Sequence, residues 1–550
     1  MRVRSTALAA AALGTALLLA GCTSGGGSPS GASSTPVAGG TLRYASGDAE
    51  PTCLDPHVGG NYPQALVASQ YLEPLVGRDA SGAIIPWLAT SWTTSPDGLS
   101  WDFTLKDGVT FHDGTPFDAA AVRANVLQIL DPATKSSTGY LALAKVADVE
   151  VVDRLHARFH LSAPDAALLE SLSQPWTAME SPAGMARGVD ANCLQPYGTG
   201  PFEVSEWVHQ DHITLTRYDG YASPPADAAH QGPAYLDSIL WRFIPDAATR
   251  YAALQSGEVD IIDNAQPDTV AQAQQNPSAG IVALQAPRPG ASNRIEFNGG
   301  QGPFTDQRVR EAFIRAVDVD AGVKSLFFGT APRSYSPLSS VEPDAYSAPD
   351  DFPYDPAAAA KLLDEAGWTP GPDGIRVKDG QRLVLRFPVS TNQSIPAEQS
   401  LFQQFQASAK QAGFDVQISL LDLSSWYAAL AAHEYDLVSA PYTKVGPDVL
   451  RILYDTEGIT PAPSGYFANL AQVSIPELDQ LLSQASATLD PAQRAQLYQQ
   501  AQKIILDQAR ILPLYDQQNN FLYRSDGHGV RALATVSTPT FLDAWVSKGS

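Results

Sequence analysis

Cysteine, positive charge and long apolar runs are all scarce in this chain. It has 35 lysines and arginines against 58 aspartates and glutamates, which gives a formal charge of −23. A surface that acidic disfavours nucleic acid as a partner, and it disfavours attachment to an anionic membrane through charge alone. After the first 21 residues no apolar run approaches the roughly 18 residues of a membrane-spanning helix, so we expect none in the body.

The short motifs of several enzyme classes are also missing. The sequence contains no GxxxxGK[ST] phosphate loop, no GxSxG elbow, no HExxH zinc motif and no CxxC pair. "HQDH" at 209–212 is interpreted as an exposed turn before a strand rather than a metal site. "FHDG" at 111–114 is typical of a β-turn with glycine in the left-handed position. We therefore expect no enzyme: no catalytic residue, no cofactor and no metal.

The N-terminus resembles an export signal. Arg2 and Arg4 precede an apolar run at 7–20, which is too short to span a bilayer and is typical of a secretory signal peptide. The prediction is a signal peptide over residues 1–21.

The residues that follow predict a lipid anchor. "LAGC", ending at Cys22, looks like a bacterial lipobox, in which the cysteine carries a diacylglycerol and becomes the first residue after cleavage. The alternative is a secreted protein with an incidental cysteine. The segment after it is rich in glycine and serine and has no charged or aromatic residue, so residues 22–40 are predicted to be the lipidated cysteine and a flexible tether.

Only two cysteines remain once Cys22 is set aside. They are Cys53 and Cys193. In an exported, oxidising setting a disulfide between them is the default expectation.

The body predicts a mixed α/β protein with more than one lobe, because its length exceeds what one hydrophobic core supports. Apolar alternation predicts strands at 41–46, 101–106, 149–161, 212–218, 238–244, 294–298, 383–389, 415–421 and 435–440. Thr305 is predicted to cap a helix within 304–318. Asp355 is predicted to cap another, with Pro356 in its first turn and Gly367 after its end. Strands alternating with helices indicate partly parallel sheets.

Several stretches in a fixed order resemble one family. The longest is "PWLATSWTTSPDGLSWDFTLKDGVTFHDGTPFDAAAVRAN" at 86–125. The others are "CLDPH" (53–57), "YLEPLV" (71–76), "YGTGPFEVSEW" (197–207), "LQSGEVDI" (254–261), "IEFNGGQGPFTDQRVREAFIRAVD" (295–318) and "YDPAAAAKLLDEAGW" (354–368). Together they resemble the extracytoplasmic solute-binding proteins of ABC importers, specifically the peptide/nickel-binding group, family 5.

The resemblance implies an α/β, two-lobed periplasmic-binding-protein clamshell of type II, in its large three-subdomain form with mixed sheets. It places the N-terminal lobe at 41–80, 196–290 and 515–550, an inserted subdomain at 81–195, and the C-terminal lobe at 291–514. Two hinge crossovers are expected near Pro287–Phe297 and Leu512–Asn519.

The implied function is capture of a small solute, with a peptide or peptide-like ligand favoured. The partners would be an ABC permease and its ATPase subunits, and the receptor would work as a monomer, lipid-anchored on the outer face of the cytoplasmic membrane. The alternatives are an oligosaccharide, a metal chelate or another non-peptide solute, or a role as a ligand sensor. A secreted lipoprotein hydrolase would require a paired acid and base in the cleft.

Family position also suggests ligand contacts. Asn61 and Tyr62 in "GGNYP" are expected from the first lobe, and Trp426 in "LSSWYAAL" and Tyr442 in "SAPYTK" from the second. Each has a plainer alternative, since Trp426 is compatible with a core position and the tyrosines with an ordinary surface.

One departure from the family concerns the ligand's amino group. Peptide-binding relatives carry a carboxylate just after the strand that is predicted here at 435–440. In this chain Lys444 or Val445 falls at that place, and Asp448 is nearby but offset. We therefore include Lys444 and Asp448 among the candidate ligand contacts, and we expect an uncharged or anionic-ended ligand to bind better than a free-amino peptide.

Overall fold

A computed structural model describes residues 35–439, 442 and 446–547 of the chain. From Val37 onward the described residues form one compact unit, and its larger strands lie in three groups. Within the described residues, no helix combines the length and the apolar character needed to cross a membrane.

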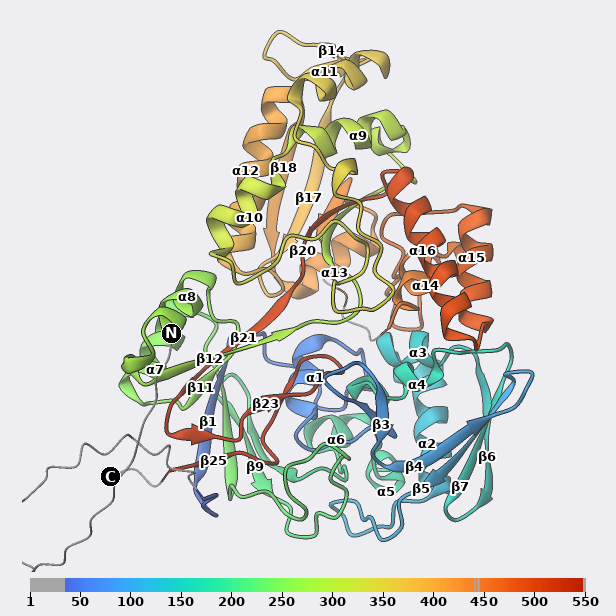
Figure 1. Cartoon of the computed structure of the whole chain (residues 1–550), viewed down its shortest axis with the longest axis vertical. Coiled ribbons are helices and arrows are strands. Elements are labelled where there is room, and N and C mark those ends of the chain that lie inside the picture. Colours follow the sequence, from blue (N-terminus) through green and yellow to red (C-terminus); the bar gives the residue numbers. More distant parts are fainter. Residues whose placement is uncertain (1–34, 440–441, 443–445, 548–550) are drawn as a thin grey trace, which may run out of the picture. The chain divides into compact units, whose positions relative to one another are not determined.

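The first group is a seven-stranded sheet that combines segments from the beginning, middle and end of the sequence (Figure 1). Its order is β12 (Ile281–Pro287), β21 (Gln518–Arg524), β11 (Ile261–Ile262), β1 (Thr41–Ser46), β10 (Ser238–Phe243), β9 (His212–Arg217) and β8 (Phe202–Val208). β1 runs parallel to β10 and β11, and the other pairs are antiparallel. Tyr44 of β1 stacks on Trp241 of β10 in the core beneath α1 (Tyr62–Ala68).

The second group is an antiparallel four-stranded sheet in the order β4 (Ala89–Thr94), β5 (Ser100–Leu105), β7 (His156–Leu161) and β6 (Val146–Asp153). Alternate residues of β5 are buried, as expected for a strand with one face on a core. Helices α2 (Ala119–Leu130) and α3 (Thr138–Leu143) belong to this region, followed by α4 (Leu168–Ser171), α5 (Pro182–Met185) and α6 (Val189–Leu194). The small hairpin β2 (Val76–Arg78) and β3 (Ile84–Pro86) precedes it.

The single strand predicted at 149–161 is wrong. The structure has a hairpin there, because the chain turns at Arg154 and Leu155 between β6 and β7. The Asp153 carboxylate accepts the backbone N–H of Leu155 at 2.9 Å, which stabilises the turn. Apolar alternation continues on both sides of the turn, so the alternation alone did not reveal it.

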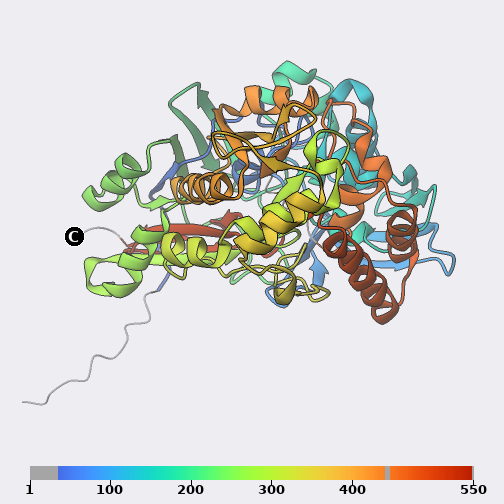
Figure 2. The ribbon, with the colours of Figure 1, turned by 90° about the horizontal axis from the view of Figure 1, so that it is seen from above.

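The third group contains two small sheets and eight of the sixteen α-helices of the described residues. β17 (Val384–Ser390) pairs in parallel with β18 (Asp415–Leu421), and α12 (Pro396–Ala412) connects them. β13 (Asn293–Phe297) lies between β19 (Leu437–Ser439) and β20 (Ile511–Tyr515). Two helices that precede β13, α7 (Ala247–Ser256) and α8 (Pro267–Gln275), pack against the seven-stranded sheet of the first group. The other helices of the third group are α9 (Gln307–Ala316), α10 (Val319–Phe327), α11 (Pro356–Glu365), α13 (Leu423–Ala431), α14 (Val449–Tyr454), α15 (Pro476–Ala487) and α16 (Pro491–Asp507). α15 and α16 lie side by side in both views (Figure 1; Figure 2).

The short remaining strands are β14 (Thr369–Pro370), β15 (Arg376–Lys378) and β16 (Gln381–Arg382), and near the C-terminus β22 (Gly527–His528), β23 (Arg531–Ala532), β24 (Pro539–Thr540) and β25 (Trp545–Val546). They form small antiparallel ladders at the edges of the larger groups.

Helix starts follow the capping rules, with one correction. Asp355 caps α11, Pro356 opens it, and Gly367 follows its end with φ +84°. Thr305, predicted to cap α9, lies instead in a 3-10 turn, where its hydroxyl donates to the carbonyl of Gly302 at 2.9 Å. The cap is Asp306, whose carboxylate accepts the N–H of Arg308 at 3.0 Å.

Two chain segments pass between the first and third groups. One joins β12 to β13, and the other joins β20 to β21. β12 pairs with β21 in the large sheet and β13 pairs with β20 in the small one, so the two crossovers run next to each other (Figure 1). They lie at 288–292 and 516–517, inside the two ranges where crossovers were predicted.

Candidate ligand-binding site

A cavity of about 700 Å³ is lined by residues from both sides of the crossovers. That volume lies within the ordinary range for sites that enclose small ligands, roughly 300–1,000 Å³. The lining is rich in aromatic rings: Tyr62, Trp176, Phe327, Trp426, Tyr427, Tyr442, Tyr466, Phe467 and Tyr515. It is therefore apolar over much of its wall, with a few polar and charged groups at defined places.

Asn61 and Tyr62 enter the cavity at the start of α1. The Asn61 side chain accepts the N–H of Gln64 at 3.1 Å, and the Gln64 side chain accepts the N–H of Asn61 at 3.0 Å. This reciprocal capping box fixes the first turn of the helix. The cap uses the carboxamide oxygen of Asn61, and both Asn61 and Tyr62 line the cavity.

Arg288 is the cation of the cavity wall. It lies on the first crossover, and its guanidinium sits 3.8 Å above the ring centre of Tyr62. Its side chain is 7% exposed, and its Nε has no hydrogen-bond partner in the described part of the chain. Arg250, which also lines the cavity, differs because it donates to four backbone carbonyls. Of these two arginines of the lining, Arg288 is thus the one with an unpartnered Nε donor.

Two carboxyl groups line the same cavity. Burial, together with nearby Asp263, raises the pKa of Asp48 to about 7, and Arg288 opposes that rise. Burial raises the pKa of Glu398 to about 7, although its carboxyl accepts hydrogen bonds from Asn293 at 2.9 Å and Ser439 at 3.1 Å. Both groups are therefore only partly ionised at neutral pH.

Tyr515, the last residue of β20 before the second crossover, is influenced by both Glu398 and Arg288. The hydroxyl of this tyrosine is buried, which raises its pKa, and the charges of Glu398 and Arg288 act on it in opposite directions.

Known proteins identify the family. Residues 83–460 match the model described as "Bacterial extracellular solute-binding proteins, family 5 Middle". The chain belongs to this family. It is 30% identical over 475 residues to the glutathione-binding protein GsiB of Escherichia coli O1:K1, which covers 84% of this chain and 86% of that one.

Solved structures of family 5 solute-binding proteins share the fold. The DppA binding protein of Helicobacter pylori, in complex with the peptide STSA, is 25% identical with a TM-score of 0.79 and covers 93% of this chain and 99% of that one. NikA of Brucella suis, in complex with Fe(III)-EDTA, is 27% identical with a TM-score of 0.76 and covers 92% and 100%. The predicted type II periplasmic-binding-protein fold and the predicted role as a solute-binding protein of ABC importers are confirmed.

The residues suggested by family position fall partly on the cavity. Tyr62, Trp426 and Tyr442 line it, as does Asn61. Trp426 is also a core residue, packed with Leu430, so the two interpretations of this side chain are compatible. The indole N–H of Trp426 has no hydrogen-bond acceptor among the described residues.

Asp448 lies away from the cavity lining. Its carboxylate is buried, accepts two hydrogen bonds from Arg451, at 3.1 and 2.9 Å, and accepts one from the Tyr498 hydroxyl at 3.2 Å. This network gives the carboxylate a structural role. Lys444 and Cys22 lie outside the described residues, so their roles stay predictions.

Sequence reasoning missed Arg288, Asp48 and Glu398. Arg288 stands in the Pro/Gly-rich stretch "APRPGASN", and an arginine in a predicted crossover is a signal that could have been used. Asp48 follows β1 directly, at the end of a strand where side chains project toward a cleft. Glu398 sits inside a helix, and nothing in its local pattern distinguishes it from a surface residue.

Proposed function

We propose that this chain is a lipid-anchored receptor that captures a short peptide-like solute through the solute's free carboxylate. It passes the solute to an ABC permease without chemical change. The observation that carries this proposal is Arg288, a buried guanidinium with an unpartnered donor on the wall of a cavity of about 700 Å³.

The carboxylate preference follows from the cost of burying charge. A buried cation requires an anionic or hydrogen-bonding partner, and a guanidinium matches a carboxylate with two parallel hydrogen bonds. The stack on Tyr62 holds the plane of the Arg288 guanidinium in place, which reduces the entropy lost on binding. The aromatic rings around it suit the side chains of a short peptide.

The amino end of the ligand is secondary in this proposal. Asp48 and Glu398 provide two carboxyls, but their raised pKa values leave each partly neutral at pH 7. A ligand ammonium therefore gains less there than a carboxylate gains at Arg288. This supports the expectation that an anionic-ended ligand binds better than one recognised by its amino group alone.

Closure would use the two crossovers as hinges. Ligand contacts from Tyr62 and Arg288 on one side and Trp426 on the other would favour the closed state, because only that state satisfies both sets at once. We assign the first lobe to 41–80, 196–290 and 515–550 with the inserted subdomain at 81–195, and the second lobe to 291–514.

The anchor is the lipid on Cys22, preceded by a signal peptide and followed by the tether to residue 40. The glutathione-binding relative and the peptide-bound relative support a peptide-like ligand. A tethered monomer at the outer face of the cytoplasmic membrane would stay near its permease at high effective concentration.

The test is calorimetry on the exported protein after bound solutes have been removed by unfolding and refolding. The probes are glutathione and a tri- to pentapeptide pool in three forms: free, C-terminally amidated and N-acetylated. Amidation should weaken binding much more than acetylation. Arg288→Gln should lower affinity for the free pool by roughly 30-fold or more, since truncating a buried charge pair costs about 2–5 kcal/mol.

The control is Arg154→Gln, which neutralises an exposed arginine paired with Asp107 and should leave binding unchanged. Tight binding that acetylation abolishes and amidation spares would contradict the carboxylate assignment. Failure of every peptide probe, together with a sugar or metal chelate in extracts of the native protein, would contradict the ligand class.

A further inference from the structure

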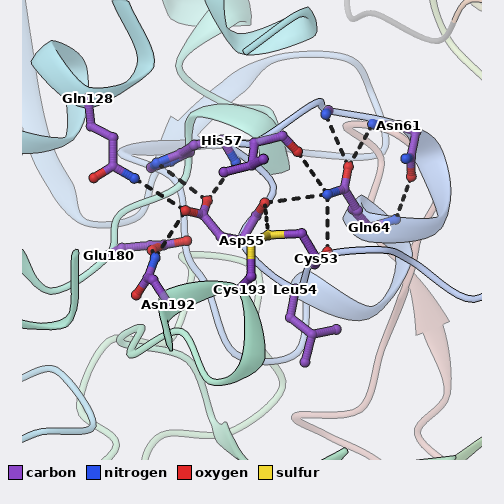
Figure 3. Close-up of a disulfide and its surroundings, with 12 residues drawn as sticks. Cys53, Leu54, Asp55, His57, Asn61, Gln64, Gln128, Glu180, Asn192 and Cys193 are labelled. Atoms are coloured by element: carbon purple, nitrogen blue, oxygen red, sulfur yellow. Dashed lines mark hydrogen bonds and ion pairs between the residues drawn. A yellow bond between two sulfur atoms is a disulfide. The ribbon is translucent and has the colours of Figure 1, made fainter. Parts of the chain in front are cut away.

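A second polar cluster lies outside the cavity, beside the disulfide that the structure forms between Cys53 and Cys193. Asp55 and His57 follow Cys53 in the loop before α1, and Glu180 precedes α5 (Figure 3). All three side chains are buried, with relative exposures of 1%, 0% and 0%. One ligand atom from each lies within 4.8 Å of those of the other two.

The imidazole of His57 presents a lone pair to this cluster. Its Nε2 lies 2.8 Å from the carbonyl oxygen of Ala178, and a carbonyl only accepts hydrogen bonds, so Nε2 carries the hydrogen. In the neutral form of the ring, Nδ1 is therefore the nitrogen that carries the lone pair. It has no hydrogen-bond donor in the described part of the chain and lies 3.8 Å from Asp55 Oδ1.

The two carboxyls differ in their hydrogen bonds: both oxygens of Asp55 have partners, whereas one oxygen of Glu180 has none among the described residues. The Asp55 carboxylate accepts a hydrogen bond from the backbone N–H of His57 at 2.8 Å. It also accepts from the side-chain amides of Gln128 at 3.2 Å and Asn192 at 3.0 Å. Glu180 Oε2 accepts from the same Asn192 amide at 2.5 Å, while Oε1 has no partner among the described residues. Figure 3 shows these groups converging from separate segments.

The charge balance calls for something positive at this place. Two ionised carboxylates with no cation between them would place two negative charges in a buried site, which is costly without compensation. Either a proton or a cation can occupy the space between the three acceptors, and a divalent cation would neutralise both carboxylates.

We propose that Asp55, His57 and Glu180 bind one divalent cation of the zinc type as a structural site. One imidazole nitrogen and two carboxylate oxygens are a donor set that Zn²⁺ accepts, at about 2.0–2.2 Å from each ligand atom. Small inward rotations would bring atoms now within 4.8 Å of one another onto a common ion. Burial makes the site a structural one, filled while the chain folds.

The cation would hold the loop that supports the ligand cavity. Gln64, which completes the capping box at Asn61, also donates to the carbonyls of Cys53 at 3.1 Å and Val58 at 2.9 Å. An ion on Asp55 and His57 would fix the same loop from its other side, and Glu180 would tie it to the segment before α5. The site therefore acts on stability and is independent of which solute the cavity holds.

The test uses the exported protein with its disulfide intact, unfolded in guanidinium with a chelator and refolded with or without one equivalent of ZnCl₂. Refolding with zinc should leave about one zinc per chain by elemental analysis after gel filtration, and it should raise the melting temperature. Co²⁺ in place of zinc should give a visible absorption spectrum of nitrogen and oxygen ligation.

Glu180→Gln should abolish zinc retention and the zinc-dependent rise in melting temperature. Glu73→Gln is the matched control, because Glu73 is a buried carboxyl in the same region that accepts from the hydroxyls of Thr199, Tyr221 and Ser223. It should retain the zinc. If Glu180→Gln does not fold, the zinc content and melting shift of the unmodified protein decide the matter.

Two outcomes overturn the proposal. A protein that keeps no zinc and melts at the same temperature with and without it has a proton at this place. Zinc that is retained equally by Glu180→Gln is bound elsewhere, for example near the more exposed His209 and His212.

Discussion

Glu398→Gln should stabilise the ligand-free protein at alkaline pH and have little effect in acid. Glu398 lies in the first turn of α12, is 2% exposed and accepts hydrogen bonds from Asn293 and Ser439. Glutamine keeps the accepting oxygen for both donors, and its amide can donate toward the Tyr515 hydroxyl. The substitution therefore removes the titration while keeping the shape.

The sign of the effect follows from the pKa. Burial raises the pKa of Glu398 to about 7, whereas in the unfolded chain it has its ordinary value near 4.5. Between these values the folded state binds more protons than the unfolded state, so stability falls as pH rises. The shift of about 2.5 pH units corresponds to about 3 kcal/mol of stability, which is fully present below pH 4.5 and lost by pH 8.

The assay is thermal unfolding of both proteins between pH 4.5 and 8. For a chain of roughly 500 residues the unfolding entropy is about 1 kcal/mol per degree, so the variant should melt about 3 °C higher at pH 8. Glu477→Gln, the same change in the exposed first turn of α15, should give a small difference that does not vary with pH. A difference between Glu398→Gln and the unmodified protein that stays flat across this range would refute the reasoning.

Three further predictions can be checked with simple measurements. Replacing both Cys53 and Cys193 by serine should cost up to about 5 kcal/mol, because their disulfide closes a loop of 140 residues; unchanged melting in non-reducing buffer would contradict this. Cys22→Ala should move the protein from the membrane fraction to the soluble fraction, and persistent membrane association would argue against lipidation. Gly198→Ala should prevent folding or lower the melting temperature sharply, since a Cβ there would overlap the backbone carbonyl of Tyr71; normal yield and melting would show that this contact can relax.

The fold was largely predictable because its signals are local. Aspartate followed by proline predicted the start of α11, and the alternation of apolar residues in β5 predicted a strand with one buried face. The errors were also local: Asp306 rather than Thr305 caps α9, and a turn divides the strand predicted at 149–161. Both errors arise at short polar segments, where the sequence is compatible with more than one cap position or with either a strand or a turn. Only the packing of neighbouring elements decides between these structures.

The aromatic part of the cavity was predictable in part, and its charges were not. Tyr62 and Tyr442 came from the family's order of motifs, and the cavity includes them. Periodicity cannot show that Arg288 or Glu398 is buried, because it assigns polar residues to the surface by default. Each is buried by partners distant in sequence: Arg288 lies over Tyr62, and Glu398 meets Asn293.

The same limitation explains why the cluster beside the disulfide went unnoticed. The nine histidines show no metal-binding spacing along the chain, and that led to the expectation of no metal. Spacing reveals sites whose ligands share one short segment, as in a zinc finger. Here Glu180 comes from a segment far from Asp55 and His57 in sequence, and the disulfide between Cys53 and Cys193 brings both segments together. A buried histidine whose unpartnered ring nitrogen faces two carboxyls becomes visible only when those segments are folded together, so the chemistry of this protein must be sought at its long-range contacts.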